Sequence, residues 1–380
     1  MLRLPTALAA AARELGRLPE LLEAEKLYAS GEFRNALRHV ERAVDVVRAV
    51  PIPAMQLVAG GVLAQTLRAS GEADREAGVW KESVGRLSNG PDEAVLRCHA
   101  LHGAVSSHLH LGDGGAAMAL CDEAAPLVTP GTPLAASLGA HRSLARLLLR
   151  GEPSSGLVDQ LRADVDARTE EMAASPSSDA AGAAVAGTSI LLGDAHALAG
   201  DDEAAREIWI SLAADGGGEG GGEGAAGVPL PAEHARALRE VALKLRLGAS
   251  WLRSGDAAAS RDACTAAADL CEERLPPLHP LLPHTLGHLA LALTAEGEFV
   301  TAEGLYRSAT DTLSGAGGDA AVPVSHVPLL LPTLEAFATL LQSLETNGKP
   351  RCAEADQMRE RARVLRVSYA SALPKGTDAG

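Results

Sequence analysis

The side chains best suited to metal chemistry in this sequence are histidines, and they gather in two places. The first group is the stretch LRCHALHGAVSSHLHLG, in which Cys98 and His99 are followed by His102 and two further histidines. Two imidazoles three residues apart on one helix face can contact the same ion. A closed site needs more ligands at the same level along the helix axis, and His110 stands about 12 Å further along that axis than His102. We interpret this group as a polar row on a helix, with metal binding as the alternative.

The second group is formed by His279, His284 and His288. His284 and His288 are one helical turn apart and could share a ligand. His288 stands next to Leu289, which belongs to an apolar helix face. We interpret these histidines as structural and predict that the protein has no metal site.

Other chemical motifs are incomplete. The spacing Gly216-x-Gly218-x2-Gly221 follows no predicted strand, and Glu219 and Glu223 between these glycines would repel a phosphate. No Gly-x-Ser-x-Gly elbow in a strand-to-helix pattern is present for a serine nucleophile. The sequence therefore predicts a protein that is not an enzyme and needs no cofactor.

Charged side chains alternate near the C-terminus. The arginines are Arg351, Arg359, Arg361, Arg363 and Arg366, and the acids among them are Glu354, Asp356 and Glu360. This mixture is typical of a helix whose outer face meets water at the end of an array. A surface for an acidic partner is the alternative.

Composition narrows the class of protein. Lysine and arginine total 34 against 49 acids, which gives a net charge of −15, and aromatic residues make up only 2%. An acidic chain with few rings repels phosphate backbones and lacks stacking platforms, so we expect no nucleic-acid partner. Alanine and leucine dominate, which favours helices. No run reaches the roughly 18 to 20 apolar residues of a membrane span.

Cysteine usage and the N-terminus bear on location. The five cysteines are scattered and odd in number, which argues against a disulfide framework and for a reducing compartment. We therefore expect an intracellular, cytoplasmic protein. The segment MLRLPTALAAAAR has two arginines and no acid. It is read either as a short targeting sequence for mitochondria or plastids or as the first turns of a capping helix.

The elements that must position these residues are paired helices. Around Gly297, apolar residues recur at steps of three and four on both sides. They are Leu286, Leu289, Ala290 and Leu293 before the glycine, and Ala302, Leu305, Tyr306, Ala309 and Leu313 after it. Gly297 suits the left-handed backbone that often ends a helix. Neither helix can bury its apolar face alone, which predicts stacking against further pairs.

These residues resemble a tetratricopeptide repeat. Leu289-Ala290-x2-Leu293 and Ala302-x3-Tyr306 stand where that family has Leu-Gly-x2-Tyr and Ala-x3-Phe. His279-Pro280 before the first helix is similar to the entry of kinesin-light-chain-like repeats, which are longer than the usual 34 residues. The resemblance implies small residues where two helices approach closely.

The pattern recurs along most of the chain. Turn glycines are expected at Gly31, Gly71, Gly112, Gly151, Gly200, Gly255, Gly297 and Gly348. Four of the seven separations are 39 to 42 residues. Trp80, Trp209 and Trp251 fall at core positions of their repeats. The predicted fold class is all-α, a right-handed tetratricopeptide-like superhelical solenoid of about seven to eight helix-turn-helix repeats.

The expected division of the chain follows these repeats. An N-terminal cap or targeting segment covers 1–17, repeats one to five cover 18–214, a glycine-rich loop or linker covers 215–231, repeats six and seven cover 232–314, a loop covers 315–326, a degenerate terminal repeat covers 327–370, and a tail covers 371–380. Whether the glycine-rich run separates two sub-solenoids or is a surface loop stays open.

The resemblance implies that the first helix of each pair lines a concave groove for a partner peptide or helix. Projection from the turn glycines places in this groove Tyr28, Gln65, Arg68, His99, His102, Ser106, His141, Asp194, His284 and Gln342, with Leu109, Leu148, Leu245 and Leu252 as apolar members. Arg68 supplies the one fixed positive charge, so the Lys/Asn/Arg set that chaperone-binding relatives use to clamp a carboxylate is missing. We expect Arg68→Glu or His102→Ala to weaken partner capture.

The leading hypothesis is a non-enzymatic adaptor or scaffold that binds other proteins in this groove. The alternative is a structural or assembly subunit of a mitochondrial or plastid multiprotein complex, held through its convex or edge surfaces. Cleavage of the first 17 residues or so, or their ability to direct a reporter to an organelle, would favour the alternative.

Overall fold

The computed structural model describes residues 4–29, 32–88, 90, 93–129, 132–150, 155–174, 179–215, 232–277, 279–314, 322–323, 326–346 and 349–372. Within these ranges the chain forms seventeen α-helices, one short 3₁₀ helix and a single pair of two-residue strands. Its contacts divide it into two compact units, residues 1–236 and 237–380, with the boundary near the start of α12.

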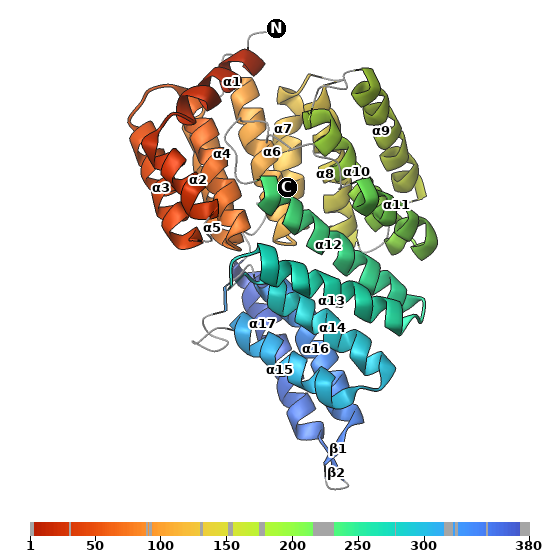
Figure 1. Ribbon diagram of the computed structural model, residues 1–380. Coiled ribbons are helices and arrows are strands. Elements are labelled where there is room, and N and C mark those ends of the chain that lie inside the picture. The colour runs from red at the N-terminus through yellow and green to blue at the C-terminus, as the bar shows by residue number, and fades with distance from the viewer. Residues whose placement is uncertain are drawn as a thin grey trace. The chain divides into compact units, whose positions relative to one another are not determined.

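The first unit is a series of helical hairpins (Figure 1). Its helices are α1 (Leu4–Leu15), α2 (Pro19–Ala29), α3 (Phe33–Arg48), α4 (Pro53–Ala69), α5 (Ala73–Arg86), α6 (Ala94–His110), α7 (Gly114–Ala124), the 3₁₀ turn Ala125–Leu127, α8 (Pro133–Arg150), α9 (Ser155–Ala174), α10 (Asp179–Leu198) and α11 (Asp202–Asp215). From α2 to α11 each helix packs on the next, α1 packs on α4, and α4, α6, α8 and α10 also contact one another in that order. These first helices of successive pairs therefore form one continuous layer.

Helix α1 is part of this core. Ala11, Ala12 and Leu15 are buried in a cluster with residues of α2, α3 and α4, and α1 packs directly on α4. This packing agrees with the interpretation of the N-terminal segment as a capping helix, while its role in targeting stays a prediction.

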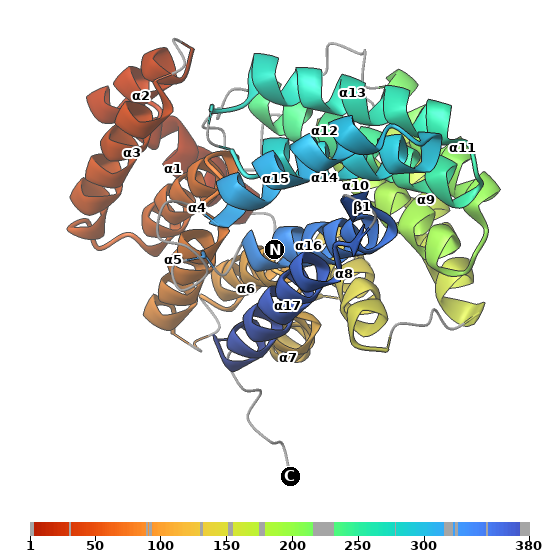
Figure 2. The same cartoon turned by 90° about the horizontal axis from the view of Figure 1, so that it is seen from below.

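The second unit, described by itself, is also built of consecutive helices (Figure 2). Its helices are α12 (Ala232–Arg253), α13 (Ala257–Arg274), α14 (Leu281–Glu296), α15 (Phe299–Ser314), α16 (Val327–Ser343) and α17 (Cys352–Ala372). The strands β1 (Glu345–Thr346) and β2 (Lys349–Pro350) pair antiparallel between α16 and α17. The sequence predicted helices on either side of a turn and gave no sign of these strands.

Turn glycines end the first helices as expected. Gly71, Gly112, Gly200, Gly255 and Gly297 all have positive φ, a backbone conformation that glycine adopts without strain. At Gly297 the N–H of Glu298 donates to the carbonyl of Leu293 at 2.9 Å, which closes the helix end. Gly31, Gly151 and Gly348 lie outside the described residues. The predicted fold class, an all-α solenoid of paired helices, is confirmed.

Several second helices begin with an aspartate cap. Asp113, Asp201 and Asp256 directly follow turn glycines, and each accepts a hydrogen bond from the backbone N–H three residues later, at 2.9, 3.2 and 2.9 Å. The carboxylate satisfies an amide that has no partner within the helix. The Gly-Asp dipeptide therefore ends one helix and starts the next.

Small residues let the helices of a pair approach closely. Gly193 of α10 faces the buried indole of Trp209, and a Cβ at position 193 would lie only 2.3 Å from its Nε1. In the seventh pair Ala302 and Tyr306 are fully buried, and the Tyr306 ring stacks on Phe337 at 5.5 Å. The prediction of a core tryptophan holds for Trp209. Trp80 is half-buried and packs against a cluster of buried residues that includes Leu57 and Ala100, and Trp251 is half-buried.

The described helices include none that is both long enough and apolar enough to pass through a bilayer. All five cysteines carry free thiols, and four of them are buried. Burial raises the pKa of the Cys98, Cys121, Cys264 and Cys271 thiols to about 11. These four side chains are therefore protonated at neutral pH and are poor nucleophiles.

Candidate binding surface on the first helices

The surface begins at Arg68, in the last turn of α4. Its Nε and Nη2 donate to the two carboxylate oxygens of Glu76 on α5, at 3.0 and 2.5 Å. The Glu76 side chain is only 1% exposed, whereas Arg68 is 35% exposed. A buried carboxylate therefore holds a guanidinium that still reaches solvent, and two parallel hydrogen bonds fix its plane.

From Arg68 the contacts run to α6 and then to α8. Nη2 of Arg68 also donates to the hydroxyl of Ser106 at 3.2 Å. One turn earlier on α6, Nε2 of His102 lies 2.7 Å from the hydroxyl of Ser137 on α8. The rings of His102 and His141 stand 4.9 Å apart and are tilted by 54°. We call Arg68, Ser106, His102, Ser137 and His141 the inner row.

The helical period explains why the inner row is continuous. Ser106 follows His102 by one turn on α6, and His141 follows Ser137 by one turn on α8, so each pair shares a helix face. The contacts between α4, α6 and α8 then bring the faces together. Each of the five side chains is neither buried nor fully exposed. They form a surface that is polar yet partly withdrawn from water.

His99 extends the α6 part of this surface. It precedes His102 by one turn and is half-buried. Burial lowers the pKa of His99, so its imidazole is uncharged at neutral pH. His108, on the same helix, lies 3.4 Å from the carboxylate of Asp113 and belongs to the turn. Among the described residues, no group of three histidine, cysteine or acidic side chains is placed to hold a metal.

Two further predicted groove residues belong to the first unit, on α4 and α10. Gln65 is exposed on α4, one turn before Arg68. Asp194 is half-buried on α10. The side chain of Tyr28 lies outside the described part of the structure. The structure thus brings together Arg68, Ser106, His102 and His141 of the predicted set, with His99 on the same helix.

The remaining predicted residues belong to the second unit. His284 and His288 meet edge to face with ring centroids 4.7 Å apart, and burial lowers the pKa of His284 to about 3. Gln342 is exposed on α16, where it accepts a hydrogen bond from Arg359 of α17. The place of these residues in a groove stays a prediction.

The predicted apolar groove residues differ in how far their side chains are buried. Leu109 and Leu252 are half-buried, and the side chain of Leu148 lies outside the described part. The prediction for Leu245 is wrong, because this residue is only 8% exposed and packs against Ala267 and Cys271 of α13. Its side chain faces the partner helix of its own hairpin and is not available to a ligand.

Two residues of the surface escaped sequence reasoning. Ser137 gave no signal beyond its place one turn before His141. Glu76 did give one: it stands five residues after its turn glycine, where five of the other hairpins have Ala36, Ala117, Ala205, Ser260 and Ala302, all buried. An acid at a small-residue position next to a second helix requires a nearby cation. Arg68 is that cation.

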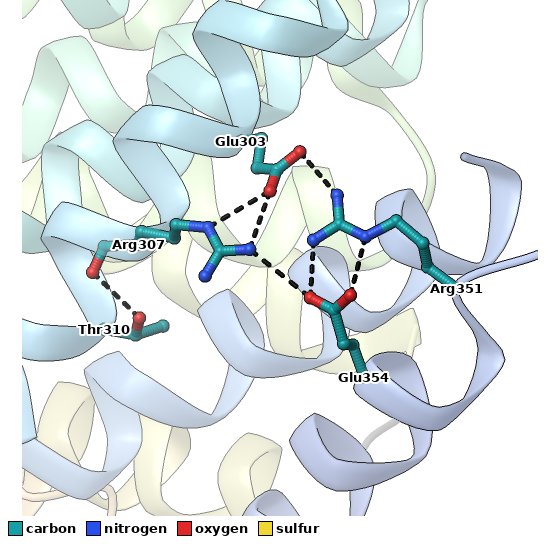
Figure 3. A network of polar contacts seen from close by, with 5 residues as sticks. All are labelled: Glu303, Arg307, Thr310, Arg351 and Glu354. Atoms are coloured by element: carbon teal, nitrogen blue, oxygen red, sulfur yellow. Dashed lines mark hydrogen bonds and ion pairs between the residues drawn. The ribbon is translucent and has the colours of Figure 1, made fainter. Parts of the chain in front are cut away.

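The arginines near the C-terminus are engaged within the protein. Figure 3 shows Arg351 and Arg307 bridging the carboxylates of Glu303 on α15 and Glu354 on α17. The four side chains alternate in charge and tie α15 to the start of α17. Outside this network, Arg359 bonds to Asp356, Arg363 to Glu360 and Arg366 to Glu335. These ion pairs favour the interpretation of a terminal cap over a surface for an acidic partner.

Comparison with known proteins adds little to this picture. No family model and no curated protein matches the sequence. Among solved structures, the chain is similar to NprR in complex with its cognate peptide NprX, at 11% identity over 92% of this chain and 97% of that chain, with a TM-score of 0.49. A tetratricopeptide repeat protein from Parabacteroides merdae gives 13% identity, 86% and 99% coverage and a TM-score of 0.39. Yeast Tom70 gives 12% identity over 93% of this chain and 85% of that chain, with a TM-score of 0.25. The candidate surface rests on its own contacts.

Proposed function

We propose that this chain is a non-enzymatic adaptor or scaffold, and that it binds a peptide or helix of a partner protein on the face of α4, α6 and α8. The observation that supports this most is the inner row itself. Five polar side chains from three helices are linked across the layer of first helices. They are half-buried, so their hydrogen-bonding groups are held in place without being sealed from a ligand.

A peptide matches this surface chemically. An extended chain carries backbone N–H and C=O groups that need partners once water is displaced. Hydroxyls and imidazoles can donate and accept, and the guanidinium donates. The half-buried Leu109 lies one turn beyond Ser106 on α6, where it packs against a core cluster that includes Val105 and keeps part of its apolar surface exposed. The residues of the inner row are thus equipped to bind a peptide.

The test is affinity purification with mass spectrometry, using the full chain as bait. His102→Ala should reduce capture of specific partners at least about tenfold, because it removes a ring at the centre of the row. Arg68→Gln is the second variant. Arg68→Glu is unsuitable, since a new carboxylate would face the buried Glu76. The matched controls are His39→Ala and Arg42→Gln, both on the second helix α3.

Partners lost with both inner-row variants and retained with both α3 variants would support the proposal. Partners retained with all four variants would contradict it. Circular dichroism of each variant separates loss of binding from loss of structure. The intracellular location and the alternative of an organellar complex subunit stay predictions.

A further inference from the structure

Glu76 is the residue of this surface that packing does not explain. Its position is occupied by a small buried residue in other hairpins, as at Ala117 and Ala205. A carboxylate there loses hydration and gains stability only from its partner. An alanine would fill the same position without losing hydration and without needing a charged partner. The role of Glu76 therefore goes beyond packing: it holds the guanidinium of Arg68 in place and offsets its charge.

The pair cancels the fixed charge of the inner row. Both carboxylate oxygens of Glu76 lie within 2.5 to 3.0 Å of the Arg68 guanidinium, and the acid is 1% exposed. The negative charge lies directly beneath the positive one and cannot move away. A ligand approaching the exposed side of Arg68 meets N–H donors whose net charge is close to zero.

Several neighbouring groups add no charge. Ser106 and Ser137 are neutral, and burial lowers the pKa of His99, which favours its uncharged imidazole. The rings of His102 and His141 stand 4.9 Å apart in the same row. Arg97 of α6 and Arg142 of α8 form ion pairs with Glu123 and Asp122 of α7.

We propose that the inner row recognises an uncharged peptide segment through hydrogen bonds, and that Glu76 is the specificity-determining residue that keeps acidic segments out. This inference rests on the proposed function. Arg68 is positioned by Glu76 to donate to a carbonyl or amide oxygen. Without Glu76, the same guanidinium would be an uncompensated cation and would select a carboxylate. The net charge of −15 on the whole chain adds to the exclusion of acidic segments.

The experiment is selection from a phage-displayed library of random dodecapeptides against the immobilised full chain. The peptides selected should carry no net charge. Their affinity should change by less than about threefold between low and high salt, because screening acts only on net charges. Glu76→Gln keeps the size of the side chain and leaves Arg68 charged. This variant should select acidic peptides, bind them about tenfold more tightly than the parent chain does, and lose that gain in high salt.

Two further variants complete the design. Arg68→Gln combined with Glu76→Gln removes both charges and should return the selection to uncharged peptides. Glu82→Gln makes the same substitution on α5 at an exposed acid paired with Arg48 and Arg86, and should leave the selection unchanged. Circular dichroism confirms that each variant is folded.

The outcomes are distinguishable. Acidic peptides selected by the parent chain, with binding that falls steeply in salt, would overturn this inference and leave the proposed function standing. The same holds if Glu76→Gln selects the same uncharged peptides as the parent. If His102→Ala weakens the binding of none of the selected peptides, the proposed function fails, and the inference fails with it.

Discussion

Arg68 has two roles at the residue scale, because it neutralises Glu76 and also reaches Ser106 across the layer of first helices. Arg68→Ala should lower the free energy of unfolding of the first unit by about 2 kcal/mol, since it leaves a buried carboxylate without its partner. Urea titration followed by circular dichroism measures the change. Arg42→Ala, at an exposed position of α3, should change stability by less than about 0.5 kcal/mol.

Equal and small effects of the two substitutions would mean that Glu76 finds another partner or takes up a proton. The double variant Arg68→Ala with Glu76→Ala separates these cases. It restores the small residue found in other hairpins and should recover most of the lost stability, because neither charge is then left alone.

At the element scale, the spacing of paired helices depends on small residues at the crossing points. Gly193→Ala should destabilise the protein by about 1 to 3 kcal/mol, because the new Cβ would overlap the Trp209 indole. Gly187 is on the same helix, α10, and a Cβ there meets nothing within 4 Å. Gly187→Ala should stabilise by up to about 1 kcal/mol through helix propensity. Thermal unfolding of both variants measures these effects. A melting temperature that shifts in the same direction for both variants would contradict this packing.

The link between α15 and α17 should depend on pH. The hydrogen bond from Arg351, and to a smaller extent the one from Arg307, lowers the pKa of Glu303 below its ordinary value. A carboxyl with a lowered folded-state pKa stabilises the fold fully above its unfolded-state pKa, which is about 4.3. That stabilisation is lost as pH falls through the lowered folded-state pKa.

The measurement compares Glu303→Gln with the parent chain in urea titrations from pH 7 to pH 3. The parent should be more stable at pH 7, and the difference should shrink below about pH 4. The control is Glu272→Gln, at an exposed residue of α13, and should show little difference at any pH. A difference for Glu303→Gln that stays constant down to pH 3 would show that the network does not act through charge.

At the scale of the whole molecule, each unit has its own core. Clusters around Val241 and Cys271, around Tyr306 and Phe337, and around Leu330 lie within the second unit. In an array of this kind each hairpin depends mainly on its neighbours. A fragment of residues 232–380 should therefore fold alone. A helical circular dichroism spectrum with cooperative melting would support this, and an unfolded fragment would contradict it.

The parts of the fold that depend on local sequence could be predicted, and the parts that depend on distant contacts could not. Turn glycines and helix faces follow from periods of a few residues, so Gly71 and Gly297 were placed correctly. Leu245 was misplaced because its burial depends on α13, which a projection of one helix ignores. The position of Glu76 marks it as an acid where other repeats have a small residue, but its partner Arg68 is brought to it only by the packing of α4 on α5.

The central claim is that the face of α4, α6 and α8 is where a partner binds. The most direct test is a photo-crosslinking amino acid placed at Gln65, which is exposed one turn before Arg68, and in a second chain at Arg42, on the second helix α3. The account predicts covalent capture of specific protein segments from position 65 and none from position 42, with capture lost when His102→Ala is added. Equal capture from both positions, or capture from position 65 that persists with His102→Ala, would contradict it.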